Sequence, residues 1–274
     1  AAFPSQALGR PVLGSAEIVG SLKREEIKGY LQSHYGLGTM LISAAGKIEH
    51  DHLVDLVGRH FDALGPSERA KPEPAAYAGG ERRDERDLEQ AHVVLGFPSV
   101  GYHHPDHHAF QVFSTLFGGG SASRLFQQVR EKRGLAYSIY SFASAFLDGG
   151  VFGIYAGTSP EQVTELMPVL AEELATVAAT LSEAELKRAR TQLKAGMLMS
   201  RESTGNRAET LANQMLIFGR PGPIAETVAK IDAVDAAAIR RVAGLLRSGK
   251  PTVAAVGPLQ ALESYERLSD RFAA

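Results

Sequence analysis

Residues 118 to 137 read GGGSASRLFQQVREKRGLAY, and this stretch predicts a sharp turn, a helix and then a strand. Its opening glycines, Gly118, Gly119 and Gly120, allow backbone conformations that other residues avoid, so they end the preceding helix and let the chain lie against another backbone. Gly134 ends the helix that follows. The tight connection brings side chains on both sides of the second turn close together.

The helix in this stretch has one apolar face. Leu125, Phe126 and Val129 fall within about one third of its circumference, which is typical of a helix that packs on a sheet. Ser121 or Ser123 can cap its first turn. We therefore expect the helix to cover part of a sheet.

Arg130 and Tyr137 lie on either side of the helix-to-strand turn. The segment after Gly134 alternates with the period of a strand and places Leu135, Tyr137 and Ile139 on one face. The tips of Arg130 and Tyr137 could point at one extended ligand. Spacing alone favours a simpler interpretation, a solvated arginine and a core tyrosine whose hydroxyl is hydrogen-bonded.

The composition excludes several function classes. The 274 residues carry a net charge of −2 and are 44% hydrophobic, which supports a real core and argues against a role at nucleic acid or a membrane surface. No segment approaches the roughly 18 continuous apolar residues of a membrane span. With no cysteine, the chain has neither disulfides nor a thiolate nucleophile. We expect a soluble protein of a bacterial cytoplasm or periplasm.

An order of helix, strand and helix occurs twice, early in the chain and at its end. Gly46 and Gly257 are separated by the same 211 residues as Phe61 and Phe272. The early copy covers residues 22–35, 39–46 and 50–64, and the late copy covers residues 234–249, 251–257 and 259–272. If the repeat is real, only the last third of its first copy is present, and about 150 further residues are expected before Ala1.

This repeat divides the chain. We expect residues 1–64 to form the last third of a first domain, 65–87 a linker rich in proline, glycine and charge, and 88–274 a complete second domain. An isolated third of a domain exposes apolar surface, so we also expect a homodimer or docking of residues 1–64 on the second domain.

The second domain is predicted to be α+β, with helices over one sheet that is largely antiparallel. Capping boxes at Ser159 to Gln162 and Ser182 to Glu185 indicate two helix starts. Strands are expected at 91–100, 135–146 and 151–158, and helices at 105–117, 160–179, 183–202 and 206–218.

A histidine-rich cluster stands at the start of the helix expected from residue 105. It contains His103, His104, Asp106, His107 and His108. The intervening proline makes a shared helical face for metal ligands unfavourable, so we favour an exposed cluster without a metal. A metal-binding module built on this cluster remains an alternative.

Two long segments resemble one known family. Residues 118–142, GGGSASRLFQQVREKRGLAYSIYSF, and the strand GGVFGIYAGT at 149–158 resemble the C-terminal domain of the pitrilysin, insulinase and mitochondrial processing peptidase family, in its bacterial processing-peptidase-like branch. Residues 8–61, which include YLQSHYGLGTMLISAAGKIEHDHLVDLVGRHF, resemble the end of the N-terminal domain of that family.

The resemblance implies a parent protein with two homologous α+β domains and a zinc metallopeptidase activity. The zinc ligands of this family, an inverted H-x-x-E-H and a later glutamate, match no position here, so zinc is expected in the parent protein and not in this chain. By motif position, Arg130 and Tyr137 would hold the peptide and stabilise its carbonyl oxygen, and the glycine run Gly118, Gly119 and Gly120 would allow close approach of a backbone.

We therefore expect the substrate-binding C-terminal portion of a zinc endopeptidase, inactive by itself. Its expected partners are a peptide or unfolded polypeptide substrate and the missing N-terminal part of the first domain. The alternative is a non-catalytic partner or structural subunit of the same family.

Overall fold

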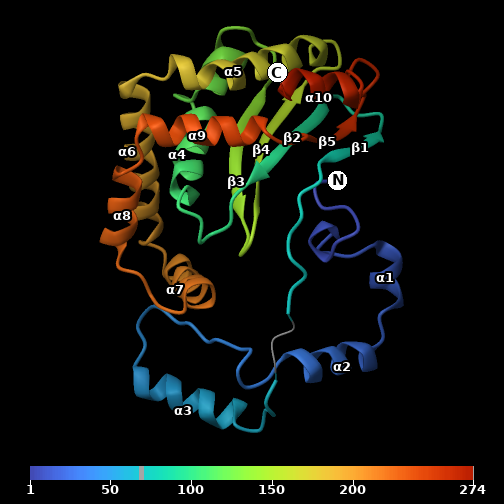
Figure 1. Ribbon diagram of the computed structural model, residues 1–274. Coiled ribbons are helices and arrows are strands. Elements are labelled where there is room, and N and C mark those ends of the chain that lie inside the picture. The colour runs from blue at the N-terminus through green and yellow to red at the C-terminus, as the bar shows by residue number, and fades with distance from the viewer. Residues whose placement is uncertain (68–70, 274) are drawn as a thin grey trace. The chain divides into compact units, whose positions relative to one another are not determined.

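The computed structural model describes residues 1–67 and 71–273 (Figure 1). The chain forms two compact units, each assembled from separate segments. The sheet unit comprises Ala1–Gly9, Pro74–Gly196 and Pro223–Ala274, and the helical unit comprises Arg10–Glu73 and Met197–Gly222.

A five-stranded sheet is the centre of the sheet unit, with the strand order β1-β5-β2-β4-β3 (Figure 1). Only β1 and β5 run parallel, and the other neighbours are antiparallel. This confirms the predicted α+β class with a largely antiparallel sheet. The strands are β1 (Gly80–Glu85), β2 (Ala91–Ser99), β3 (Ser138–Ala145), β4 (Gly150–Thr158) and β5 (Thr252–Gly257).

Helices pack on this sheet and on one another. Helix α4 lies against β3 and β4, α9 lies against β2 and α4, and α5 packs on α9 and α10. Within the described part of the sheet unit, the helical elements are η1 (Ala7–Gly9), α4 (His107–Gly118), the π-helix η2 (Phe126–Glu131), α5 (Val163–Thr180), α8 (Ile224–Asp232), α9 (Ala236–Arg247) and α10 (Tyr265–Ala273). Helix α6 (Glu183–Ser200) begins in the sheet unit and continues from Met197 as part of the helical unit.

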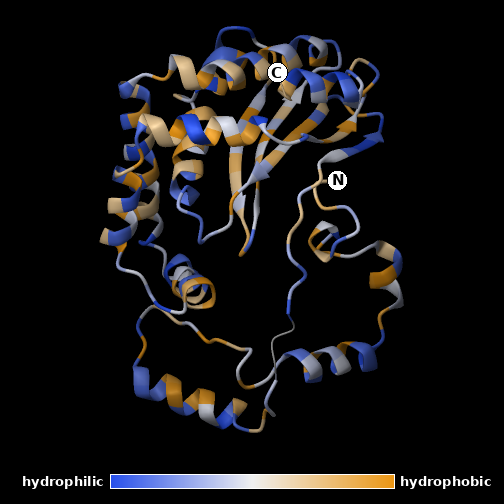
Figure 2. Ribbon diagram, viewed as in Figure 1, coloured by the Kyte–Doolittle hydropathy of each residue, from blue (hydrophilic) through white to orange (hydrophobic). Residues whose placement is uncertain are grey.

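The two faces of the sheet differ in burial. On β2, Val93 and Leu95 are almost completely buried, whereas His92 and Val94 between them are half-buried. Because side chains alternate along a strand, the first pair faces the helices and the second pair faces the opposite side, which we call the open face. Figure 2 shows orange and white segments along the central strands and blue along β1.

The core lies between α4 and the sheet. Phe113 stacks on Phe117 with ring centroids 5.3 Å apart and meets Phe152 of β4 edge-on at the same distance. All three rings are fully buried. Each such ring contributes about 1.5–3 kcal/mol by burial, so these contacts hold α4 on the sheet.

One predicted capping box is confirmed and the other is wrong. Ser182 Oγ accepts from Glu185 N at 3.2 Å, and Glu185 Oε2 accepts from Ser182 N at 3.0 Å. At the other position, α5 begins later, at Val163, because residues after Ser159 first form a backbone turn. Gln162 cannot fold back there, since its side chain donates to Gly134 O.

Several segments differ from their predicted secondary structure. The closing helix, predicted over 259–272, begins only at Tyr265. Residues 39–46, predicted as a buried strand, are irregular. Within the predicted linker, Gly80–Glu85 forms β1, whose charges are tolerated because an edge strand leaves side chains in water. Arg83 adds bonds to the carbonyl oxygens of Leu262 and Glu263. The domain limits themselves stay a prediction.

The helical unit contains α1 (Ala16–Ser21), α2 (Arg24–His34), α3 (His50–Phe61) and α7 (Thr204–Phe218) (Figure 1). None of these four helices has a buried residue. Figure 2 shows orange segments on these helices. Their exposed large apolar residues are Ile18, Val19, Ile27, Tyr30, Leu31, Val54, Leu211, Met215, Leu216 and Phe218. The exposed apolar surface expected for residues 1–64 is therefore present.

No helix in the described ranges, 1–67 and 71–273, has the length and apolar character needed to cross a membrane.

Candidate functional site

Arg130 and Tyr137 come together as predicted from the turn between them. The Arg130 guanidinium carbon lies 5.1 Å from the centroid of the Tyr137 ring and 4.8 Å from that of Phe126. These distances are those of cation–π contacts, which hold the guanidinium beside the two rings. Two groups that can donate hydrogen bonds thus share one side of the turn.

The simpler interpretation of Tyr137 as a core residue is wrong, because its side chain is 72% exposed. Leu135 and Ile139 are buried, so Tyr137 does not share their face. The reason is that β3 begins only at Ser138, and the preceding residues do not follow the alternation of a strand. Tyr137 therefore projects from the irregular turn into solvent.

The helix before the turn is wider than predicted. Lys132 N donates to Gln127 O, an i to i+5 bond, so Phe126–Glu131 is a π-helix. Gly134, with φ +65, then closes the helix by donating to Arg130 O at 3.1 Å. π-Helical turns are rare in proteins, but those that occur are often found at functional sites. This one sets the position of the Arg130 side chain on the helix.

An open pocket of about 470 Å³ lies beside Arg130 and Tyr137. Its walls come from the turn before β3, the end of β4, the start of α5 and the chain before β2. The lining residues are Glu89, Gln90, Arg130, Gly134, Ala136, Tyr137, Gly157, Thr158, Ser159 and Gln162.

Three hydrogen bonds hold the turn that carries Tyr137. Gln162 Nε2 donates to Gly134 O at 3.0 Å, Thr158 Oγ1 donates to Leu135 O at 2.6 Å, and Tyr137 N donates to Gly157 O at 3.1 Å. These roles of Thr158 and Gln162 could not be predicted from local sequence patterns, because their partners are more than 20 residues away. The pocket is thus built on fixed backbone.

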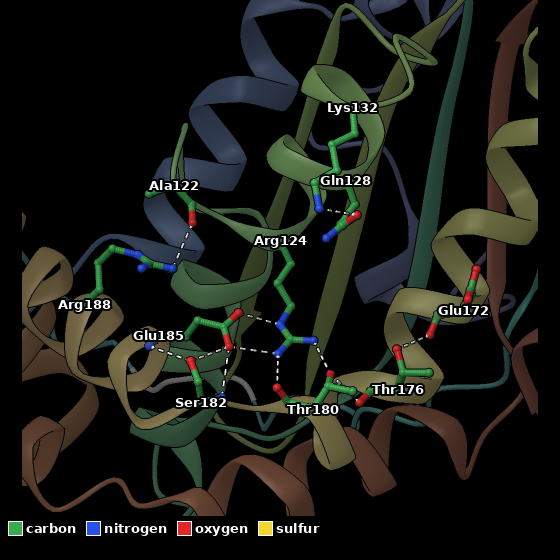
Figure 3. Close-up of polar contacts among 10 residues, drawn as sticks. All are labelled: Ala122, Arg124, Gln128, Lys132, Glu172, Thr176, Thr180, Ser182, Glu185 and Arg188. Atoms are coloured by element: carbon green, nitrogen blue, oxygen red, sulfur yellow. Dashed lines mark hydrogen bonds and ion pairs between the residues drawn. The ribbon is translucent and has the colours of Figure 1, made fainter.

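Arg124 anchors the start of the same helical segment (Figure 3). Its Nε and Nη2 donate to the two carboxylate oxygens of Glu185 at 2.9 and 3.0 Å, and Nη1 donates to Thr180 Oγ1 at 2.7 Å. Both charged side chains are largely buried. Burial alone would raise the pKa of Glu185, but the bonds from Arg124 and Ser182 lower it overall. The segment is thereby tied to the α5–α6 connection.

The glycine run packs inside the sheet unit. A Cβ atom at Gly118 would lie only 2.3 Å from Ser141 N, so the end of α4 touches the backbone of β3. The side chain of Gln192 in α6 bonds to Gly119 O. Among the described residues, the pocket lining does not include Gly118, Gly119 or Gly120. Their role in substrate binding stays a prediction.

The histidine cluster is not fully exposed, contrary to the interpretation from the sequence. His107 is 8% exposed, since the first turn of α4 packs into the core. Burial, followed by the charges of His108 and Lys230, lowers the pKa of His107 to about 4. Asp106 is paired with Arg241 at 2.6 Å. Throughout the described residues, no group of three or more His, Asp or Glu side chains is arranged to hold a metal ion.

A family profile described as "Peptidase M16 inactive domain" matches residues 21–193. The chain is 34% identical over 257 residues to an uncharacterized zinc protease of Rickettsia felis, covering 93% of this chain and 62% of the relative. It is 36% identical over 281 residues to an uncharacterized zinc protease of Streptomyces coelicolor, covering 99% of this chain and 61% of the relative. The chain thus spans about three fifths of the length of these relatives.

Two further similarities extend to eukaryotic proteins. Mitochondrial-processing peptidase subunit beta of Pongo abelii is 33% identical over 97% of this chain and 57% of its own length. A chain in the structure titled "Complex III2 from Candida albicans, Inz-5 bound" superposes with a TM-score of 0.89 at 24% identity, covering 100% of this chain and 68% of that chain. The second similarity supports the fold alone.

Proposed function

Since the chain belongs to the peptidase M16 family, which unites pitrilysin, insulinase and mitochondrial processing peptidases, and matches its inactive domain, we propose that it is the substrate-holding portion of a zinc-dependent endopeptidase. The observation that carries this proposal is the joint position of Arg130 and Tyr137 at one open pocket. The substrate in this proposal is a peptide or an unfolded polypeptide.

The chemistry of the two side chains suits a peptide main chain. Arg130 presents several N–H donors in one planar group beside the rings of Phe126 and Tyr137, and the carboxylate of Glu131 is 4.0 Å away. Tyr137 adds an exposed phenol donor. Two donors beside each other orient a peptide carbonyl, and they bind its oxygen more tightly as that oxygen gains negative charge during hydrolysis.

The residues of this chain do not fit a zinc site, because the described part contains no suitable group of ligands. We assign zinc to the whole protein, whose relatives bear the name zinc protease and are longer than this chain. By this proposal the chain alone binds peptide without cleaving it, and residues 1–64 complete a first domain with protein that this sequence does not contain.

A second candidate is a non-catalytic subunit of a multi-chain peptidase. Its support is the similarity to a processing-peptidase subunit beta and the exposed apolar faces of the helical unit, which provide surface for another chain. Zinc content of the purified whole protein separates the two candidates: stoichiometric zinc supports the first, and its absence supports the second.

The proposed roles are tested in the whole protein with a fluorogenic peptide. We expect Arg130→Ala and Tyr137→Phe each to lower kcat/KM by about 10- to 100-fold, the loss of one or two hydrogen bonds to a charged group. Arg133→Ala is the matched control, because Arg133 lies on the same turn but bonds to Gln128 O. Full activity in both pocket variants would refute the assignment.

A further inference from the structure

Three rings form a row across the open face of the sheet. Tyr140 of β3 is paired directly with Tyr155 of β4, and their ring centroids are 4.9 Å apart. Tyr155 lies next to His92 of β2, with centroids 6.1 Å apart and a 2.8 Å hydrogen bond between Tyr155 Oη and His92 Nδ1. The ring planes are nearly parallel, at 26° and 25°. We call these three residues the aromatic row.

Within the described residues of the sheet unit, the segments that hold Phe3 and Tyr77 cover one end of the open face. There, Tyr77 donates to Gly96 O at 2.9 Å, and Phe3 packs edge-on against Tyr77 and Phe146. Phe3 is 5% exposed as a result. The aromatic row lies toward the opposite end of β2, where Tyr140 is 47% exposed. The same sheet face is therefore closed by the protein itself at one end and accessible at the row.

The row adjoins the pocket of Arg130 and Tyr137. Gly157 lines that pocket, and a Cβ atom at Gly157 would lie 3.2 Å from Tyr155 Oη and 3.7 Å from His92 Nδ1. The absence of a side chain at this position leaves the pocket and the row continuous. Pocket and row are thus two parts of one surface.

The pocket and the row are close in the sequence of both strands. Tyr137 of the pocket is three residues from Tyr140, and Gly157 of the pocket is two residues from Tyr155. Because an extended peptide advances about 3.3 Å per residue, a peptide bound at Arg130 and Tyr137 needs only a few further residues to reach the row. Within the described residues, the Tyr140 hydroxyl has no hydrogen-bond partner, so the outer ring of the row is free for contact.

We propose that the aromatic row is a side-chain subsite that takes a large apolar or aromatic residue of a bound peptide. This inference rests on the proposed function, since it requires a peptide at Arg130 and Tyr137. The row favours a ring or a branched apolar chain over a charged group because Tyr140 and Tyr155 offer ring surface and no formal charge. It adds a preference for one residue type to a pocket that otherwise recognises main-chain atoms.

The test measures binding to the 274-residue chain by fluorescence anisotropy. The probes are fluorescein-labelled octapeptides of alanine and serine in which a single phenylalanine occupies each position in turn, and one peptide without phenylalanine. We expect at least one phenylalanine peptide to bind about 3- to 10-fold more tightly than the peptide without it, the size of one aromatic contact.

Substitutions then locate the preference. Tyr140→Ala is expected to reduce it below about 2-fold and to leave the affinity for the peptide without phenylalanine unchanged, whereas Tyr140→Phe retains it. Leu147→Ala is the matched control, since Leu147 is an exposed apolar residue in the β3–β4 turn. Should Tyr140→Ala fold poorly by circular dichroism, Tyr140→Thr replaces it, because threonine suits a strand.

The outcomes separate this inference from the proposed function. Arg130→Ala should lower the affinity for every peptide by the same factor. If Arg130→Ala has no effect but Tyr140→Ala removes the phenylalanine preference, the role of Arg130 is wrong and the row remains a subsite. If no phenylalanine peptide binds more tightly than the peptide without it, or if the preference survives Tyr140→Ala, the inference is overturned.

Discussion

Replacing Arg124 with alanine should destabilise the sheet unit by removing the anchor of the π-helix η2. Arg124 makes two bonds to Glu185 and two to Thr180, and its side chain is 11% exposed while that of Glu185 is 20% exposed. The substitution leaves the Glu185 carboxylate largely buried without its cation.

The magnitude follows from this geometry. Removing one partner of a fully buried ion pair costs about 3–5 kcal/mol. Here both groups keep some contact with water, and Glu185 retains its bonds from Ser182, so we expect a loss of about 2–3 kcal/mol. Urea unfolding followed by far-ultraviolet circular dichroism measures the loss, because the chain has no tryptophan.

The pH dependence supplies an independent check. The pKa of Glu185 is lowered in the folded chain, so the stability that it contributes is present at neutral pH and is lost as pH falls through that lowered pKa. The difference between wild type and Arg124→Ala should therefore shrink in acid. If the free energy of unfolding of Arg124→Ala at neutral pH is within about 0.5 kcal/mol of the wild-type value, this reasoning is refuted. Changes of that size are typical of surface substitutions without structural consequence.

Two further predictions concern packing and acid stability. Gly118→Ala should cost about 1–3 kcal/mol in the same unfolding assay, because the new Cβ atom would overlap Ser141 N, and an unchanged urea midpoint would contradict that contact. The folded pKa of His107 lies near 4, below the ordinary value, so protons bind the unfolded chain preferentially and stability should fall as pH drops from about 6.5 toward 4. His107→Gln should flatten this decline, and an unaltered pH profile would show that His107 is not its source.

Local patterns in the sequence predicted much of the site. The tight helix-to-strand connection placed Arg130 near Tyr137, and the structure confirms that they meet. The capping box of Ser182 and Glu185 could be predicted because its two residues are three positions apart in the sequence. Features of this kind depend on neighbours in the chain, so composition and spacing suffice to predict them.

Contacts between segments that are distant in the sequence could not be predicted from local patterns. Arg124 finds Glu185 across 61 residues, and the aromatic row depends on the register of three strands, which a single sequence does not define. The exposure of Tyr137 was missed because the strand alternation begins only after it. The strand β1 was missed because an edge position allows charged residues that composition associates with a linker.

The most direct test of the central claim is photo-crosslinking of a bound peptide at Tyr137. Benzoylphenylalanine is introduced at Tyr137 in one protein and at Leu147 in a control, and each is irradiated with the fluorescein-labelled phenylalanine octapeptide. Peptide held between Arg130 and Tyr137 predicts strong labelling at position 137 and weak labelling at position 147. Equal labelling at both positions, or none at position 137, would contradict the assignment of this pocket as the peptide site.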